Sequence, residues 1–76
     1  MIHTMETIHF TLRPEEDFIP LIQLLKATQV VSSGSEAQAV VSEGLVLRNG
    51  EVELRKRAKI TAGEKIVFDE FLIIVK

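Results

Sequence analysis

The sequence contains no cysteine, tryptophan or tyrosine, and it has only two histidines. Without cysteine, neither a disulfide nor a thiolate metal site can stabilise the fold. His3 and His9 stand six positions apart, and this spacing does not match the histidine pairs of common zinc motifs. The hydroxyl and amine side chains that remain show no arrangement typical of an activated nucleophile. We therefore predict a protein that is not an enzyme and that uses no metal or cofactor.

Long hydrophobic runs are also missing. No apolar stretch approaches the roughly 20 residues that a membrane helix needs, and the first residues lack the basic and apolar regions of a signal peptide. A chain of 76 residues is the size of one domain with a thin core. These features predict a small single domain, residues 1–76, located in the cytoplasm and without a membrane partner.

Positive charge is scarce except in one short segment. The formal net charge is −2, yet residues 47–60 alone carry +3, whereas residues 1–46 carry −4. Five of the nine basic residues fall within this segment: Arg48, Arg55, Lys56, Arg57 and Lys59. A local cationic field on an acidic chain indicates a specific anionic partner more strongly than the net charge would.

The first half of the chain reads as a strand followed by two helices. Residues 7–12 alternate apolar and polar side chains, with Ile8, Phe10 and Leu12 on one face, as in a half-buried strand. A helix is expected from about 17 to 28, with Asp17 as N-cap and Pro20 in the first turn. Its buried stripe contains Phe18, Leu21, Ile22 and Leu25.

A second, shorter helix should begin at one of two capping-box patterns. Ser33 and Ser35 are each a suitable N-cap, and the sequence does not decide between them. Gly44 is the expected residue with positive φ that ends this helix.

A β-hairpin follows, and its turn is the strongest local signal. Asn49-Gly50 between apolar alternations is typical of a type I′ turn. This turn places Arg48 opposite Glu51 as a favourable cross-strand pair. It also puts four apolar residues on one face, which we expect to be the core face: Leu45, Leu47, Val52 and Leu54.

Beyond the hairpin, the same period places Ala58 and Ile60 on the core side and lets Arg55, Arg57 and Lys59 project together on the other. Lys56 falls on the core side, so a bulge or the end of regular pairing is expected near residue 55. A turn at 61–64, a strand at 65–68, a tight connection at Asp69-Glu70 and a buried, central strand at 71–75 complete the chain. The fold class is α+β, with two short packed helices against a small, mostly antiparallel sheet.

The basic face and the start of the second helix both suit phosphate groups. Hydroxyls and free N–H groups at 32–35 form a natural anion site at a helix N-terminus. All four phenylalanines fit core positions, so binding through base stacking is not expected. Contact with the backbone and shape of a structured RNA fits better.

The stretch from Val30 to Ile66 resembles the RNA-binding domain named after small-subunit ribosomal protein S-four, also called the αL RNA-binding motif. The likeness is greatest to small stand-alone bacterial members and covers roughly residues 17–68. It depends on the Leu-rich first helix, the 36–44 helix, Asn49-Gly50-Glu51-Val52, the basic run, and an Ala62-Gly63-Glu64 turn. Glu36 and Gln38 depart from the family, since many members carry Arg or Lys around this helix.

The resemblance implies RNA binding by the hairpin and the N-terminal half of the second helix. It assigns RNA contacts to Ser33, Ser35, Gln38, Arg48, Asn49, Arg55, Lys56, Arg57 and Lys59. The expected partner is ribosomal or transfer RNA, with the ribosome or a ribosomal subunit as a further candidate and no small-molecule substrate. The alternative is a protein–protein module whose basic face meets an acidic partner.

Overall fold

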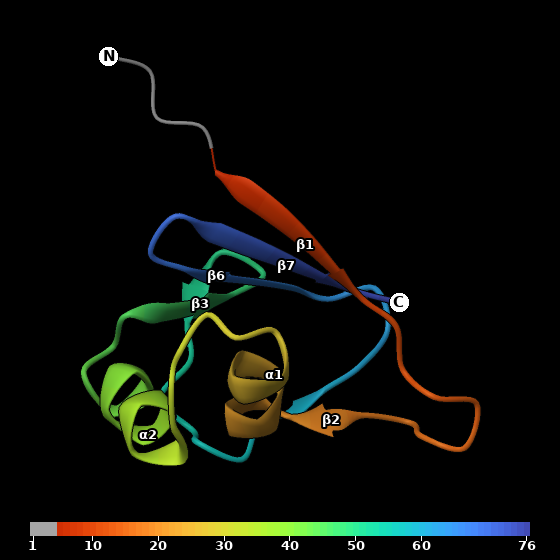
Figure 1. Cartoon of the computed structure of the whole chain (residues 1–76), viewed down its shortest axis with the longest axis horizontal. Helices are drawn as coiled ribbons and strands as arrows, with labels where there is room; N and C mark the ends of the chain where they lie inside the picture. The colour runs from red at the N-terminus through yellow and green to blue at the C-terminus, as the bar shows by residue number, and fades with distance from the viewer. Residues whose placement is uncertain (1–4) are drawn as a thin grey trace.

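The computed structural model describes residues 5–76. Its helices are α1 (Leu21–Ala27) and α2 (Gly34–Ser42). Its strands are β1 (Glu6–Phe10), β2 (Ile19–Pro20), β3 (Val46–Arg48), β4 (Glu51–Val52), β5 (Lys59–Ile60), β6 (Lys65–Phe68) and β7 (Phe71–Val75). Both helices lie on the same side of the main sheet, so that the molecule has two layers (Figure 1).

The main sheet has the strand order β1-β7-β6-β3-β4, and a separate pair joins β2 to β5. Only β1 and β7 run parallel, with Ile8 opposite Ile73; the other pairs in the described chain are antiparallel. This confirms the predicted α+β class with a mostly antiparallel sheet, and β7 is an interior strand, between β1 and β6, as its apolar run indicates.

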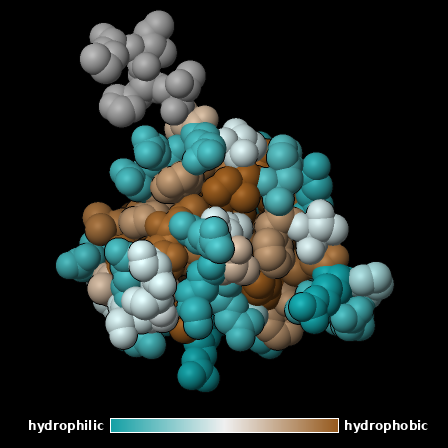
Figure 2. Space-filling view, in the orientation of Figure 1, coloured by the Kyte–Doolittle hydropathy of each residue, from teal (hydrophilic) through white to brown (hydrophobic). Residues whose placement is uncertain are grey.

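The core lies between the helices and one face of the sheet. Its fully buried side chains come from both layers: Leu21, Leu24, Leu25, Val41, Val46, Ile60, Ile66, Ile73 and Val75. On the opposite face of the sheet, Leu47, Leu72 and Ile74 are only half-buried, because no helix covers them. Figure 2 shows hydrophobic and hydrophilic side chains interspersed on the face of the molecule that it presents. No helix in residues 5–76 has the length and apolar character to cross a membrane.

Helix α1 begins four residues later than the sequence predicts. Pro20 is its N-cap with extended dihedrals, and Asp17 does not cap it. The backbone before it is extended because β2 pairs with β5, where Ile19 lies opposite Ile60. The Leu21 and Ile22 N–H groups then donate to the carbonyls of Ala58 and Lys56, at 2.9 and 3.2 Å. A tertiary contact thus replaces the side-chain cap, and Phe18 stays 37% exposed instead of joining the buried stripe.

Helix α2 resolves the choice between two starts in favour of Ser33. Its Oγ accepts a hydrogen bond from the Glu36 N–H at 3.1 Å, and the Glu36 carboxylate accepts one from the Ser32 N–H. Two donors at the start of the helix are satisfied reciprocally, as in a capping box. Gly44 ends the helix region with φ +74°, as predicted.

The hairpin has the predicted turn and register but presents the opposite face to the core. Asn49 and Gly50 both have positive φ, 51° and 89°, and Leu47 pairs with Val52. The expected core residues Leu45, Val52 and Leu54 are 52%, 53% and 60% exposed. Val46 and Glu53 are buried instead. Arg48 lies on the same face of the strand as Val46, and this face can turn toward the core because ion pairs with Glu53 and Glu64 neutralise the Arg48 charge.

Regular pairing ends after Val52, in agreement with the break expected near residue 55. Residues 53–58 are irregular, and the Ala58 N–H donates to the Arg55 carbonyl at 3.2 Å to close a turn. The chain then enters β5, so Arg55, Arg57 and Lys59 do not project from one extended strand. Ala58 and Ile60 are buried as predicted, because the β2–β5 pair and the start of α1 cover them.

Replacing Gly44 with alanine should lower the free energy of unfolding by about 1 kcal/mol, because an L-residue at positive φ is strained. A Cβ there would stand 3.6 Å from Val52 Cγ1, an ordinary contact, so that the backbone carries the cost. The matched control is Gly34→Ala, at a helical position where a Cβ meets only the Lys26 side chain at 3.8 Å. Urea denaturation should show Gly34→Ala equal to the parent or more stable; an equal loss in both variants would contradict the argument.

Candidate nucleic-acid interface

Arg48 is the centre of an ion-pair cluster next to the turn of the hairpin. Its Nε donates to Glu64 Oε1 at 2.7 Å and its Nη2 to Glu64 Oε2 at 3.0 Å, a bidentate pair. Nη1 donates to Glu53 Oε1 at 3.1 Å, and Nη2 also to the Lys59 carbonyl at 2.9 Å. The predicted partner, Glu51, makes no side-chain hydrogen bond among the described residues. Arg48 therefore ties together the hairpin, β5 and the 61–64 turn.

The two carboxylates of this cluster are held in their ionised form. Hydrogen bonds from Arg55 are the main cause that lowers the pKa of Glu53 to about 2, against the opposing effect of burial. The Glu64 pKa is also lowered to about 2, chiefly by its hydrogen bond with Arg48, and the Thr61 N–H adds a further bond at 2.7 Å. The pKa of Arg48 rises in turn, mainly because of Glu64. The cluster is therefore charged at neutral pH.

The exposed Asn49 side chain forms hydrogen bonds within the protein through both its nitrogen and its oxygen. Its Nδ2 donates to Glu64 Oε1 at 3.0 Å, and its Oδ1 accepts from the Lys65 N–H at 2.9 Å. These bonds join the hairpin tip to β6. The structure thus gives Asn49 and Arg48, two predicted contact residues, roles in shaping the hairpin.

Arg55 combines an internal bond with an exposed side chain. It donates to Glu53 through Nε and Nη2, both at 3.1 Å, although 73% of the side chain stays accessible. An open depression of about 430 Å³ brings it together with the cations predicted to share a face, and its lining consists of Arg48, Arg55, Arg57, Ala58 and Lys59. The turn geometry of residues 55–58 gathers these cations here.

Three exposed cations carry the positive charge of this surface. In residues 5–76, the ion pairs found involve Arg48 or Arg55, so Lys56, Arg57 and Lys59 have no carboxylate partner within the described chain. The Lys59 ammonium lies 5.1 Å from the centre of the Phe18 ring, a cation–π contact that orients it without neutralising it. We call residues 55–59 the basic turn.

The start of α2 forms a separate polar surface. Ser33, Ser35 and Gln38 are all exposed there, and the Ser33 hydroxyl is used as the cap. Lys26 of α1 reaches the same place, since its Nζ lies 3.9 Å from the position that a Cβ on Gly34 would occupy. An ammonium group thus stands beside a helix N-terminus, and both favour an anion there, next to the Glu36 carboxylate that accepts from the Ser32 N–H.

The two predicted parts of the interface lie at opposite ends of α1. The basic turn bonds to the first N–H groups of α1, whereas Lys26 is near its last residue. Seven helical residues span about 10 Å. Among the described residues, no hydrogen bond links the basic turn to Ser33, Ser35 or Gln38. An extended or folded polyanion would be needed to contact both.

Comparison with known proteins assigns the fold. A family model described as "S4 domain" matches residues 12–76. The chain belongs to the S4 domain family. This confirms the family resemblance found in the sequence, and the match extends beyond the 17–68 stretch because it takes in β7.

Relatives of this S4 domain include two curated bacterial proteins. "Putative RNA-binding protein YbcJ" of Escherichia coli and "Uncharacterized protein YbcJ" of Shigella flexneri are each 42% identical over 50 residues, or 66% of this chain and 71% of theirs. The solution structure of E. coli YbcJ, described as revealing an αL motif involved in RNA binding, superposes with a TM-score of 0.65. The two sequences are 35% identical, and the superposition covers 97% of this chain and 96% of the YbcJ chain.

Sequence reasoning missed two features of this S4 domain. Lys26 was not expected at the start of α2, because its approach to Gly34 depends on how the helices pack; its exposed position after Leu25 was the available signal. Phe18 was expected in the core but lies on the surface, whereas Phe10 packs against the core as expected, half-buried beside an open pocket. His3 falls outside the described residues, and no cluster of three or more metal-ligating side chains occurs in residues 5–76.

Proposed function

We propose that this S4 domain binds structured RNA, ribosomal or transfer RNA, without a catalytic step, and that the whole chain, residues 1–76, acts as one RNA-binding domain. The gathering of Arg55, Arg57 and Lys59 around one open depression carries the proposal, with the exposed Lys56 next to them in the chain. Nearby acidic residues Glu53 and Glu64 are used inside the Arg48 cluster, so Lys56, Arg57 and Lys59 present net positive charge. The names of the YbcJ relatives agree with this class of ligand.

Each predicted contact residue receives a role in the proposal. Arg55, Lys56, Arg57 and Lys59 would contact phosphates, because their charges face solvent. Ser33, Ser35 and Gln38 would contact a second part of the RNA near Lys26. Arg48 and Asn49 would contribute mainly by holding the hairpin in shape, since their polar atoms already have protein partners. A ribosomal subunit would offer both the RNA and the length needed to reach both surfaces.

The direct test is binding of the purified protein to ribosomal RNA, transfer RNA and a duplex DNA of matched length across a salt series. Affinity for RNA above that for DNA, with log K falling against log salt on a slope of about −2 to −4, supports phosphate contacts on an RNA shape. No RNA binding at low salt would remove the proposal. Specific capture of an acidic protein by the same surface would then support the protein–protein alternative.

Neutralising two cations of the basic turn should weaken RNA binding without affecting the fold. We expect Lys56→Gln with Arg57→Gln to lower affinity about tenfold at moderate salt and to reduce the salt slope by up to 2, since each lost phosphate contact contributes about 0.9. The control is Lys65→Gln with Lys76→Gln, which removes the same charge from exposed sites elsewhere. Equal losses in both double variants would mean that overall charge, rather than the basic turn, governs binding.

A further inference from the structure

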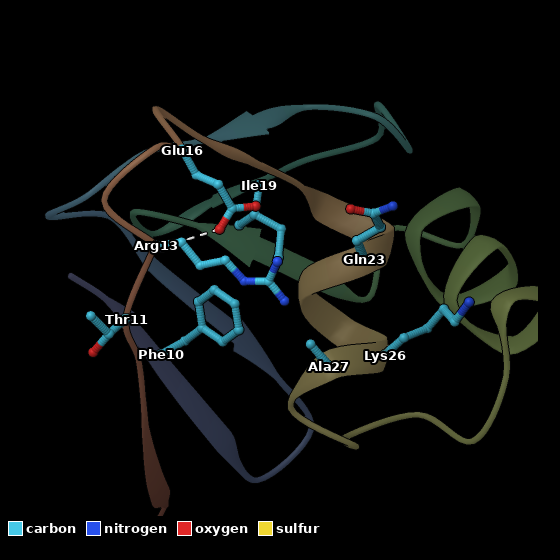
Figure 3. A pocket seen from close by; sticks show the side chains of 8 residues that line it. All are labelled: Phe10, Thr11, Arg13, Glu16, Ile19, Gln23, Lys26 and Ala27. Carbon is cyan, nitrogen blue, oxygen red and sulfur yellow. Dashed lines mark hydrogen bonds between the residues drawn. The ribbon is translucent and has the colours of Figure 1, made fainter.

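A second open pocket lies on the side of α1 away from the hairpin. Its volume is about 690 Å³, within the range of small-molecule sites. The connection between β1 and β2 forms one wall and α1 the other (Figure 3). The lining residues are Phe10, Thr11, Arg13, Glu16, Ile19, Gln23, Lys26 and Ala27. Only Lys26 among them belongs to the two surfaces described above.

The connection holds Arg13 at the mouth of this pocket. The Arg13 N–H donates to Glu16 Oε1 at 3.1 Å, and the Glu16 N–H donates to the Arg13 carbonyl at 2.9 Å. These reciprocal bonds close the turn and occupy one carboxylate oxygen with the backbone. The Arg13 guanidinium makes no ion pair within residues 5–76 and extends into the space between Phe10 and Ile19 (Figure 3).

The residues that line the pocket combine apolar surface with hydrogen-bonding groups, and this combination suits a flat ring with a polar edge. Phe10 offers part of an aromatic ring, while Ile19 and Ala27 add apolar surface on which a flat ring could rest. A guanidinium plane stacks on nucleobases as an aromatic side chain does. The Gln23 amide can pair with an N–H or a C=O group at a base edge, and the second Glu16 oxygen can accept a hydrogen bond from an N–H group. A bare anion would meet the Glu16 carboxylate and apolar walls, and a purely apolar ligand would desolvate Arg13.

The pocket continues toward the start of α2. Lys26 lines it and also lines an adjacent depression with Gln29, Val31 and Ser32. Figure 3 shows the Lys26 side chain extending from α1 toward α2. If a base lay in the pocket, the group attached to it would emerge beside the Lys26 ammonium and the N-terminus of α2. Both are suitable neighbours for a phosphate.

We propose that this pocket binds a single unpaired nucleotide, with its base between Phe10 and Arg13 and its phosphate toward Lys26. The proposal builds on the proposed function, because a bulged or looped-out residue of a bound RNA is one source of such a nucleotide. A free ribonucleoside monophosphate is the other. It adds recognition of unpaired bases to a surface that otherwise reads phosphates and shape.

The test compares two RNA hairpins that differ by one bulged adenosine, together with the four free ribonucleoside monophosphates. We expect the bulged hairpin to bind about tenfold more tightly than the fully paired one, as base–aromatic stacking commonly provides. Saturable NMR shifts of the Phe10 ring protons on adding a free monophosphate would support the free nucleotide as a source. Equal hairpin affinities together with no shift of Phe10 would overturn the proposal.

Three variants separate stacking from charge and from fold. Phe10→Leu keeps an apolar side chain but should reduce the bulge preference to about one, and Arg13→Lys should reduce it while preserving the positive charge. Phe71→Leu is the control, because Phe71 is also half-buried in the sheet but does not line the pocket. A preference unchanged in Phe10→Leu would overturn the proposal. Failure of both hairpins to bind would instead contradict the proposed RNA function, and the monophosphate arm would still decide the pocket.

Discussion

Replacing Arg48 with methionine is expected to lower the free energy of unfolding by about 3 kcal/mol. The substitution removes the main partner of the Glu64 carboxylate and one of the two arginine partners of Glu53, whose side chains are only 15% and 9% exposed. Breaking a buried pair on one side leaves the other charge without compensation, which costs more than the pair contributed. For a domain of this size, a loss of 3 kcal/mol corresponds to a fall in Tm of about 15 °C. Thermal and urea denaturation would measure both quantities.

The control for this substitution is Arg57→Met, which makes the same chemical change at an exposed cation. It should alter stability by less than about 0.5 kcal/mol, since surface substitutions away from such networks have small effects. A second variant, Arg48→Met with Glu53→Gln and Glu64→Gln, should recover part of the loss because neither largely buried carboxylate is then left without Arg48; Arg55 loses Glu53 but is 73% exposed to solvent. If Arg48→Met alone were as stable as the parent, the cluster would not stabilise the fold.

Acidification should destabilise the protein steeply between about pH 4.5 and pH 2. The folded-state pKa values of Glu53 and Glu64, both about 2, lie below the ordinary value of 4.5. Because the folded pKa is lowered, their contribution is present above the ordinary pKa and is lost as the pH falls through the folded values. Together the two carboxylates should contribute about 3–5 kcal/mol to the free energy of unfolding at neutral pH. This is less than twice the contribution of one carboxylate, because both interact with Arg48 and their effects are not additive.

Urea denaturation at pH 7, 5, 4 and 3 would measure this dependence. Glu64→Gln should be less stable at pH 7 and should show a flatter decline, since one of the two groups no longer titrates. Glu51→Gln is the matched control, because this exposed carboxylate of the same hairpin makes no ion pair in residues 5–76. Parallel declines in Glu64→Gln and the parent would contradict the assignment of the acid sensitivity to this cluster.

The hairpin shows what local sequence can and cannot decide. The positive φ that Asn49-Gly50 favours determines the turn, and the turn determines which residues pair. It does not determine which face meets the core, since that depends on the helices. Apolar alternation placed Leu45, Val52 and Leu54 inside, but Arg48 could turn inward only because Glu64, sixteen residues later, neutralises it. A periodicity within the hairpin carries no information about a partner that lies outside it.

The predicted start of α1 was wrong for the same reason: it depends on contacts that are distant in the sequence. Asp17 is a good N-cap by type, and Pro20 suits the first turn. The structure instead extends the backbone through Ile19, which pairs with Ile60 about forty residues later, and supplies carbonyls from the basic turn to the first helical N–H groups. By contrast, Ser33 and Gly44 lie at ends that their own neighbours define: Gly44 was predicted, and Ser33 was one of the two N-caps that the sequence offered. The candidate site follows this division. Its cations and the common side of Arg55, Arg57 and Lys59 were predicted from the sequence, but the turn that gathers them and the approach of Lys26 were not.

The parallel pairing of β1 with β7 has a consequence for the order of folding. The hairpins β3–β4 and β6–β7 close over short loops, but β1 can dock only after a contact between residues about 65 positions apart has formed, such as Glu6 with Phe71. We expect β1 to be the last strand to add and the first to open, with the earliest amide hydrogen exchange in the sheet. Phe10 lies on this strand, so the nucleotide pocket would be assembled late and lost early, while the basic turn remained intact.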